Sequence, residues 1–150
     1  MYFFIGIKGA GMAALACMFK SLGHDVEGSD IDKHLFTEES LHDLHIPIYP
    51  LGTHPKPHST VIIGNAFKDD YPDVVKVKND STLITYRYHE YLGRLMKDYV
   101  SVGITGSHGK TTSTKMMTSI LQAANTTGYL IGDGHGHLTQ DDHYLVIEAD

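Results

Sequence analysis

The segment Gly103–Thr112 (GITGSHGKTT) brings together the residue types that bind a nucleotide phosphate. Gly106 and Gly109 allow the backbone to wrap around a phosphate group, because glycine adopts conformations that other residues avoid. Lys110 places a cation near the phosphates, and Thr111 offers a hydroxyl group to Mg²⁺. This combination indicates phosphoryl chemistry with ATP as the ligand.

The elements around this segment support that interpretation. The run Val100–Thr105 predicts a strand and Lys110–Ala123 predicts a helix, so the glycines lie in the turn between them. The usual phosphate-loop pattern has one more glycine, at the position of Ile104. A lysine at the start of a helix opposes the helix dipole unless an anion is bound there, which argues against a purely structural turn.

Glu148 is the carboxylate that we expect to complete this site. It follows the apolar run Leu145–Ile147, which predicts a strand, and ligands of α/β proteins bind at the carboxyl ends of parallel strands. A carboxylate oxygen at that place is a suitable ligand for Mg²⁺ beside the phosphates of ATP. Spacing alone leaves open the alternative that Glu148 is a solvated strand end.

A second glycine-rich turn, Gly6–Gly11 (GIKGAG), lies near the start of the chain. It falls between a predicted strand, Tyr2–Ile7, and a predicted helix, Met12–Leu22, where a diphosphate would meet free N–H groups of the helix. Asp30 ends the next predicted strand, from which an acidic residue can hold a ribose hydroxyl. The glycine order differs from that of dinucleotide-binding proteins. NAD, FAD and a UDP-sugar therefore remain open, as does a turn that only packs a strand against a helix.

Strands and helices alternate along the chain, which predicts an α/β fold with a parallel sheet and helices on both faces. Further strands are expected at Asp25–Gly28, Ile46–Tyr49, Val61–Gly64, Leu83–Tyr86, Tyr129–Ile131 and Tyr144–Ile147, and further helices at Thr37–Leu44, Tyr71–Lys78 and His89–Lys97. The alternation restarts near Asp98. We therefore expect a Rossmann-like domain over residues 1–98 and the beginning of a phosphate-loop ATPase domain over residues 99–150.

Residues 99–150 are too few for a complete domain, since two or three strands and one helix leave one face of a sheet uncovered. The sequence also stops within the predicted strand-end segment Ile147–Asp150. We therefore expect the chain to be the front portion of a longer protein. We also expect residues 99–150 to be partly disordered or held by self-association through the uncovered apolar face.

The overall composition argues against several other classes of protein. With 12 Lys and Arg residues and 18 Asp and Glu residues the net charge is −6, so we expect no nucleic-acid partner and no anionic-membrane surface. No apolar run has the length of a membrane span, and we expect neither a signal peptide nor membrane insertion. The single cysteine, Cys17, excludes an intramolecular disulfide and suits a cytoplasmic location.

Four motifs in combination resemble the Mur ligase family of peptidoglycan synthesis. They are GIKGAGM at Gly6–Met12, GSD at Gly28–Asp30, TGSHGKTT at Thr105–Thr112 and VIEAD at Val146–Asp150. His108 discriminates within the family. Members that add L-alanine or recycle murein tripeptide have histidine at this position, whereas members that add later amino acids usually have asparagine or serine.

The resemblance implies a role for each glycine-rich segment: a first domain holds UDP-N-acetylmuramate, and a second holds ATP and Mg²⁺. The segment Gly64–Phe67 would line the crevice of the UDP-sugar. The residues implied to bind the UDP-sugar are Gly9, Ala10, Gly11, Met12, Ser29, Asp30, Asn65 and Ala66. Those implied to bind ATP are Gly106, Ser107, His108, Gly109, Lys110, Thr111 and Thr112, with Lys110 and Glu148 catalytic and Thr111 and Glu148 as ligands of Mg²⁺.

The implied reaction forms an amide bond and consumes ATP. ATP phosphorylates the lactyl carboxylate of UDP-N-acetylmuramate, and the amine of L-alanine then attacks the acyl phosphate. The family's amino-acid domain would lie outside these residues, so we expect this chain alone to be catalytically incomplete. Three alternatives remain: a ligase that recycles murein tripeptide, a non-catalytic UDP-sugar-binding module if 150 residues is the natural length, and a nicotinamide-dependent oxidoreductase. The last would leave Lys110 and Thr111 unexplained.

Overall fold

The computed structural model describes residues 1–149, so Asp150, the last residue of the VIEAD motif, lies outside the described residues. The first part of the chain forms a five-stranded parallel sheet in the order β3-β2-β1-β4-β5. Its strands are β1 (Tyr2–Ile5), β2 (Val26–Asp30), β3 (Ile48–Pro50), β4 (Thr60–Ile63) and β5 (Ile84–Arg87). This order is that of a Rossmann-like sheet, which confirms the predicted fold class.

Helices cover both faces of this sheet, because side chains of a strand point alternately to its two faces. Phe4 and Ile62 point toward α1, whereas Phe3 and Val61 point the other way and pack with Val74 of α3. The helices of this part are α1 (Ala10–Ser21), α2 (Glu38–Asp43), α3 (Pro72–Asn79) and α4 (Tyr88–Leu95).

The second part forms a four-stranded sheet in the order β6-β9-β7-β8. Its strands are β6 (Val100–Ile104), β7 (Thr127–Leu130), β8 (Gly136–His137) and β9 (Tyr144–Glu148). The first three in this order are parallel, and β8 runs antiparallel to β7. Strand β8 has no counterpart among the predicted strands, because two residues are too few to give a periodic pattern. The short 3₁₀ helix η1 (Met96–Asp98) precedes β6, and α5 (Lys110–Gln122) follows the phosphate loop.

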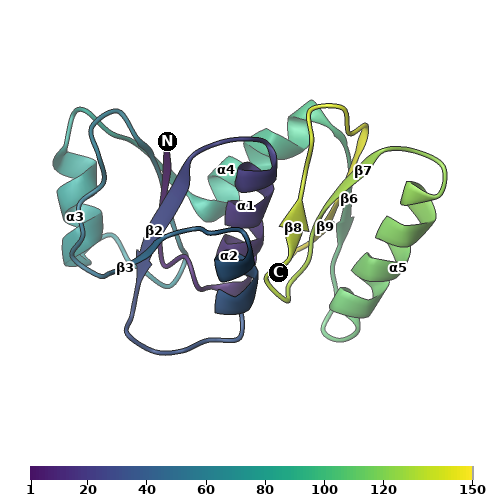
Figure 1. Ribbon diagram of the computed structural model, residues 1–150, viewed down its shortest axis with the longest axis horizontal. Helices are drawn as coiled ribbons and strands as arrows, with labels where there is room; N and C mark the ends of the chain where they lie inside the picture. The colour runs from purple at the N-terminus through teal and green to yellow at the C-terminus, as the bar shows by residue number, and fades with distance from the viewer. Residues whose placement is uncertain (150) are drawn as a thin grey trace.

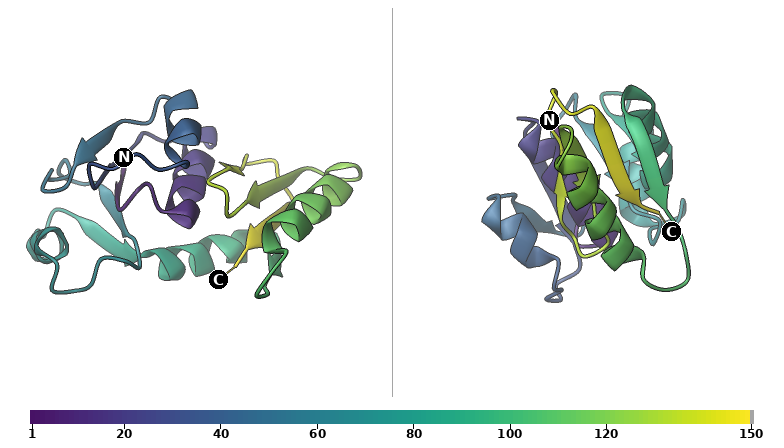
Figure 2. Two further views of the ribbon diagram at one scale, coloured as in Figure 1. Left: turned by 90° about the horizontal axis from the view of Figure 1, so that it is seen from below. Right: turned by 90° about the vertical axis from the view of Figure 1, so that its right-hand side faces the viewer.

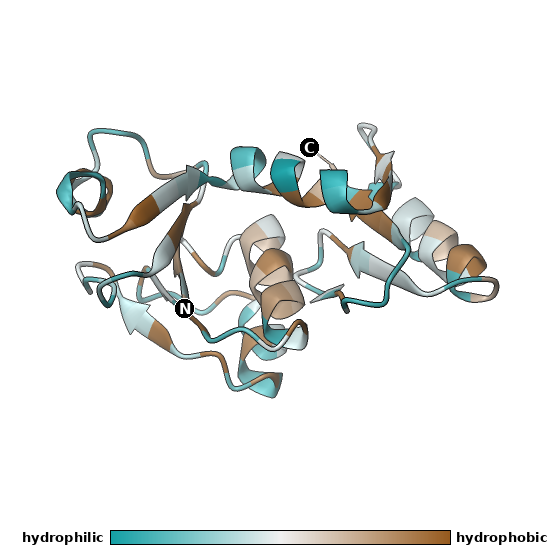
Figure 3. Ribbon diagram, turned by 90° about the horizontal axis from the view of Figure 1, so that it is seen from above, coloured by the Kyte–Doolittle hydropathy of each residue, from teal (hydrophilic) through white to brown (hydrophobic). Residues whose placement is uncertain are grey.

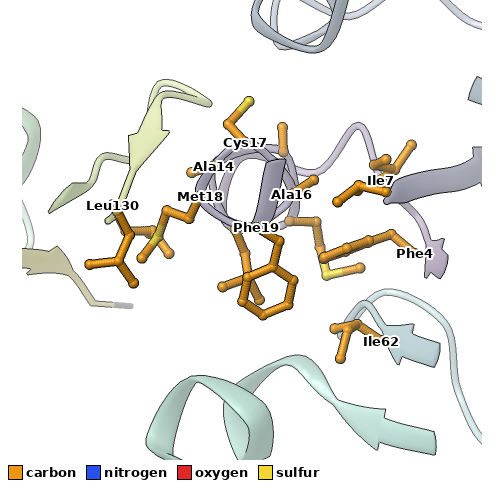
Figure 4. Close-up of a cluster of buried hydrophobic side chains, with 14 of the residues drawn as sticks. Phe4, Ile7, Ala14, Ala16, Cys17, Met18, Phe19, Ile62 and Leu130 are labelled. Carbon is orange, nitrogen blue, oxygen red and sulfur yellow. The ribbon is translucent and has the colours of Figure 1, made fainter. Parts of the chain in front are cut away.

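Helix α1 lies between the two sheets and packs against both (Figure 1). Figure 4 looks along this helix, with Phe4 and Ile7 on one side and Leu130 on the other, next to Ala14 and Met18. All five side chains belong to one continuous core. Figure 3 shows α1 as a largely apolar helix, as expected for a helix buried between two layers.

The close approach of α1 and β8 depends on Gly136, where a Cβ atom would overlap the main-chain oxygen of Ala14. Residues 99–150 alone leave one face of the second sheet uncovered, as predicted, but this face does not stay exposed in the chain. Helix α1 covers one face of this sheet and α5 covers the other. The expectation of disorder or self-association loses its basis, because the first part of the chain supplies the missing layer.

The bounds of three elements affect the site. Helix α1 begins at Ala10 rather than Met12, so the end of the first glycine turn forms the first helical turn. Strand β2 runs from Val26 to Asp30, so Ser29 and Asp30 belong to the strand, which Asp30 ends as predicted, and α4 begins at Tyr88 rather than His89. Figure 2 shows α4 running from the first sheet toward the second. Of the helices within residues 1–149, none has the length and apolar character needed to cross a membrane.

Candidate nucleotide and nucleotide-sugar site

The phosphate loop joins β6 to α5 at the carboxyl edge of the second sheet. Gly109 is the N-cap of α5 and has a left-handed backbone conformation (φ 76°), which favours glycine. No side chain caps this helix, so N–H groups of its first turn can bind an anion. Lys110 is the first residue of the helix, and the loop residues 105–109 are exposed. The loop therefore has the form that a phosphate group requires.

Thr111 and Glu148 are in direct contact, although 37 positions separate them in the sequence. The Thr111 hydroxyl donates a hydrogen bond to Glu148 Oε1 at 2.9 Å, and the main-chain N–H of Gly132 donates to Oε2 at 2.7 Å. The contact forms because β6 and β9 are parallel neighbours, so their carboxyl ends share one edge of the sheet. The structure thus brings the two predicted Mg²⁺ ligands together, while their role remains a prediction.

The chemistry of these two groups suits Mg²⁺. Hydroxyl and carboxylate oxygens are hard ligands, and Mg²⁺ usually keeps water molecules and phosphate oxygens beside one or two protein ligands. Across residues 1–149, no three or more His, Cys, Asp and Glu side chains gather in a way that could hold a metal ion. With two protein oxygens from Thr111 and Glu148, Mg²⁺ at this place would need nucleotide phosphates and water to complete its coordination.

Further charged groups lie beside this pair. Lys115, one helical turn after Thr111, contacts Asp133 with its Nζ atom 2.7 Å from Oδ2. The hydrogen bond to Asp133 raises the pKa of Lys115, and the charge of Glu148 contributes in the same direction. His135 Nδ1 lies 3.0 Å from the other oxygen of Asp133. Lys115 therefore places a positive charge at this edge of the sheet, close to the carboxylates of Asp133 and Glu148.

A cavity of about 430 Å³ lies between the first glycine turn and Glu148. Its walls include Gly9–Met12 at the start of α1 and Gly64–Phe67 after β4. Tyr88 and His89, at the start of α4, also line it. Six of the eight predicted UDP-sugar residues therefore share one cavity with the predicted Mg²⁺ ligand Glu148. Both parts of the chain contribute to its walls.

The other two predicted UDP-sugar residues, Ser29 and Asp30, do not line this cavity. Ser29 is fully buried, and its hydroxyl has no hydrogen-bond partner within the described part of the chain. Asp30 accepts hydrogen bonds from the main-chain N–H groups of Lys8 and Ile31, each at 2.7 Å. Asp30 therefore fixes the first glycine turn against the end of β2, and a contact of either residue with the UDP-sugar stays a prediction.

Lys8, in the middle of the first glycine turn, is a buried residue that the sequence pattern does not single out. Its Nζ atom lies 2.8 Å from Glu38 Oε1 and donates hydrogen bonds to the main-chain oxygens of Ile31 and Lys33. The hydrogen bond from Lys8 lowers the pKa of Glu38 to about 2. Lys8 therefore anchors the glycine turn to α2.

Tyr88 and His89 are absent from the predicted site residues although they line the cavity. His89 Nδ1 lies 3.4 Å from Asn65 Oδ1, which places the imidazole beside a predicted UDP-sugar residue. Both residues follow β5 directly, at the same carboxyl edge as Asp30. The strand-end rule that identified Asp30 could therefore have identified them as well.

Arg87 does not line the cavity but supports one of its walls. Its guanidinium group donates hydrogen bonds to the main-chain oxygen of Phe67 and to the Asp69 carboxylate. Lys78 also contacts Asp69, with Nζ 2.7 Å from Oδ1. The loop Gly64–Phe67 is thereby tied to β5.

Comparison with known proteins gives a family. The family model that matches is described as the Mur ligase family, catalytic domain, and it matches residues 2–100, which is more than half of the chain. The chain belongs to the Mur ligase family. The resemblance seen in the four sequence motifs is thereby confirmed.

Curated Mur ligases from lactic acid bacteria are similar over the whole chain. The UDP-N-acetylmuramate–L-alanine ligase of Lacticaseibacillus casei strain BL23 is 46% identical over 150 residues, which cover 99% of this chain and 34% of that protein. The ligase of the same name from Lactiplantibacillus plantarum is 43% identical over 151 residues, with 100% and 34% covered. The chain spans about a third of the length of these relatives.

Solved Mur ligase structures have the same fold. A murein peptide ligase from Psychrobacter arcticus has a TM-score of 0.82 and 28% identity, with 99% of this chain and 37% of that chain covered. The UDP-N-acetylmuramate-alanine ligase of Thermotoga maritima has a TM-score of 0.77 and 30% identity, with 98% and 36% covered. The arrangement of the two sheets around α1 therefore matches that of known Mur ligases.

Proposed function

We propose that this chain is the UDP-sugar-binding part, and the beginning of the ATP-binding part, of an ATP-dependent ligase that joins L-alanine to UDP-N-acetylmuramate. The observation that carries the proposal is that Glu148, bonded to Thr111 of the phosphate loop, lines the same cavity as Gly9–Met12. A diphosphate at the start of α1 and a nucleotide at the start of α5 would then flank one reaction space. The shared name of relatives at 43% and 46% identity supports L-alanine as the amino acid.

In this proposal residues 1–98 bind the UDP-sugar and residues 99–150 begin the ATP-binding domain. The amino-acid site and the rest of the ATP site would come from parts of the ligase outside these residues. We therefore expect the 150-residue chain to bind ligands without completing the reaction. The ligase would work in the cytoplasm, where Cys17 of this chain would stay reduced.

The residues of this chain would supply charge and positioning. Transfer of a phosphoryl group from ATP to the lactyl carboxylate brings two anions together, so their repulsion must be offset. Lys110 would contribute a positive charge, and Thr111 and Glu148 would hold Mg²⁺, which would neutralise charge on the phosphate oxygens. N–H groups at the starts of α1 and α5 orient the two phosphate-bearing substrates. The amine of L-alanine then attacks the acyl phosphate, which gives the amide and releases phosphate.

A ligase acting on a murein tripeptide is the second candidate. The Psychrobacter arcticus murein peptide ligase has a TM-score of 0.82, and the ligase for UDP-N-acetylmuramate and L-alanyl-γ-D-glutamyl-meso-diaminopimelate from Neisseria meningitidis has one of 0.79. Both activities would use the same UDP-sugar and phosphoryl chemistry. They differ in the incoming amine, so the identity of the amine decides between them.

Isothermal titration calorimetry of the chain tests the proposed binding. UDP-N-acetylmuramate, its tripeptide derivative and NAD⁺ are titrated separately, and Mg²⁺ with the ATP analogue AMP-PNP forms a fourth titration. We expect heat from UDP-N-acetylmuramate and from Mg²⁺–AMP-PNP, and none from NAD⁺. Binding of NAD⁺ in place of the UDP-sugar would overturn the proposal and favour an oxidoreductase.

The acceptor is tested in a polypeptide that contains this chain and has the length of its relatives. Phosphate release is measured with ATP, UDP-N-acetylmuramate and either L-alanine or the murein tripeptide. We expect release with L-alanine. Release with the tripeptide alone would replace the first candidate by the second.

A further inference from the structure

Ser40 connects the two parts of the chain through a turn that also holds the side chain of Glu148. It lies in α2 and is buried, and its hydroxyl oxygen lies 2.9 Å from the main-chain oxygens of both Gly134 and Thr37, so its single hydrogen is shared between these two acceptors. Gly134 belongs to the turn of residues 131–135 between β7 and β8. This turn is tight: the N–H of Ile131 donates to the oxygen of His135 at 2.9 Å, and the N–H of Gly134 donates to the oxygen of Ile131 at 3.2 Å.

The same turn holds the Glu148 side chain. The N–H of Gly132, two residues before Gly134, donates to Glu148 Oε2 at 2.7 Å. Asp133 between them is fixed by Lys115 of α5. A movement of the turn would therefore move the hydrogen-bond donor that orients Glu148.

Helix α2 is itself fixed to the first glycine turn, so it is a firm support for Ser40. Glu38 pairs with Lys8 at 2.8 Å, and the hydroxyl of Thr37 donates to the main-chain oxygen of Lys8. A Cβ atom at Gly134 would lie 3.0 Å from the Thr37 methyl group, so turn and helix are in close contact. A connected series of contacts thus leads from the first glycine turn to Glu148 and Thr111.

We propose that Ser40 is a positioning residue for Glu148 and that the first part of the chain thereby sets the geometry of the Mg²⁺ and nucleotide site in the second part. The inference rests on the proposed function, because it takes Glu148 as a ligand of Mg²⁺. Ser40 touches neither substrate nor metal. It acts through the turn of residues 131–135.

The loss of the Ser40 hydroxyl has a specific expected effect. Among residues 1–149, the donor left to the oxygen of Gly134 would be the weak Cys17 thiol, whose Sγ atom lies 3.8 Å away. The turn would then be less well fixed, and the bond from Gly132 to Glu148 would open more often. Loss of one buried hydrogen bond corresponds to a change of about fivefold in such an equilibrium.

Ser21 offers a matched control. Its hydroxyl also joins the two parts of the chain, since its single hydrogen is shared between the main-chain oxygens of Leu138 at 2.8 Å and Met18 at 2.7 Å, and its oxygen accepts the N–H of Leu138 at 2.9 Å. The hydrogen bonds of its hydroxyl within the described part of the chain go to Met18 and Leu138, outside the turn of residues 131–135. Ser21→Ala therefore removes a similar connection without disturbing the support of Glu148.

The first measurement needs no ligand, so it is independent of the proposed function. Hydrogen exchange of the Gly132 amide is followed by NMR in the wild type, Ser40→Ala, Ser40→Thr and Ser21→Ala. We expect exchange about fivefold faster in Ser40→Ala only, because Ser40→Thr keeps the hydroxyl. Equal Gly132 exchange in Ser40→Ala and the wild type would overturn the proposal, as would equal acceleration in Ser21→Ala.

The second measurement is the Mg²⁺ concentration at half-maximal AMP-PNP binding in the same four proteins. We expect a rise of about fivefold in Ser40→Ala, a value near the wild type in Ser40→Thr, and no change in Ser21→Ala even if its melting temperature falls. An unchanged Mg²⁺ midpoint in Ser40→Ala would overturn the proposal. Absence of AMP-PNP binding in the wild type would instead refute the proposed function, and the Gly132 exchange would still decide the role of Ser40.

Discussion

The Thr111 hydroxyl and the Glu148 carboxylate form a hydrogen bond of 2.9 Å that joins the phosphate loop to the end of β9. Because Gly132 holds the second carboxylate oxygen, Glu148 is fixed at both oxygens. Within residues 1–149 each oxygen accepts one side-chain or main-chain hydrogen bond, whereas a carboxylate offers about four acceptor sites. The pair is therefore arranged so that a cation can bind without rebuilding the strand end.

Replacement of Glu148 by Gln tests this arrangement. The amide can still accept one of the two hydrogen bonds, but it lacks the charge that attracts Mg²⁺. We expect Mg²⁺-dependent AMP-PNP affinity to fall by about tenfold or more, measured by calorimetry. Glu39→Gln, an exposed site on α2, is the control and should bind as the wild type does. Wild-type affinity in Glu148→Gln would contradict a metal-binding role for this carboxylate.

Arg87→Ala tests the cavity wall. The substitution frees the Gly64–Phe67 loop from β5, and we expect the affinity for UDP to fall by about fivefold because the loop must then be ordered on binding. Lys78→Ala removes the other partner of Asp69 and leaves the bond from Arg87 to Phe67 intact. It should change UDP affinity by less than about twofold. Equal losses in the two variants would assign the effect to Asp69 instead.

Gly136→Ala tests the packing of α1 between the sheets. The added methyl group must push β8 away from Ala14, which we expect to destabilise the fold by about 2 kcal/mol and to lower the melting temperature by about 6 °C. Gly103→Ala is the matched control, because Gly103 also lies in a strand and no atom lies within 4 Å of its added Cβ. Equal melting temperatures for the two variants would show that the contact is looser than described.

Those features of the fold that follow from local pattern could be predicted from the sequence. The apolar runs of β1, β4 and β9 and the two glycine turns gave the Rossmann-like sheet and the phosphate loop, because each is a continuous segment with its own signal. The role of α1 as a shared layer could not be predicted in this way. It depends on Gly136 meeting Ala14, and no local pattern connects these two distant residues.

The Lys8–Glu38 pair predicts a dependence of stability on pH. The hydrogen bond from Lys8 lowers the pKa of Glu38 from 4.5 to about 2 in the folded state. The folded state therefore binds fewer protons than the unfolded state between these values. The stabilisation is complete above about pH 4.5 and is lost as the pH falls toward about 2. We expect the wild type to be about 2 kcal/mol more stable than Glu38→Gln at neutral pH.

The measurement is urea unfolding of both proteins between pH 2 and 7. The difference in unfolding free energy should shrink on acidification and vanish near the lower limit. A difference that stays constant with pH would exclude the ionised pair as its source.

The double variant Lys8→Met with Glu38→Gln should be more stable than Lys8→Met alone, because the single variant leaves a buried carboxylate without its cation.

Those residues of the candidate site that directly follow an apolar run typical of a strand could be predicted from the sequence. Glu148 was found by this rule, and the contact with Thr111 follows from β6 and β9 being neighbours. Lys8 and Ser40 could not be found, because a lysine in a glycine turn and a serine in a short helix carry no local signal. Their importance lies in contacts with Glu38 and Gly134, which only the folded chain creates.

The position of α1 between the sheets also sets the distance between two walls of the cavity. Gly9–Met12 at its start and Glu148 at the end of β9 line one cavity whose walls are joined by the same packed core. The close contact between Ala14 and Gly136 helps to fix the separation of these two walls. Under the proposed function, a nucleotide sugar with too short or too long a spacer between its diphosphate and its carboxylate would bind at the start of α1 and leave its carboxylate out of reach of a cation held by Glu148. The cavity would therefore select its substrate by the distance between two anionic groups as well as by their chemistry.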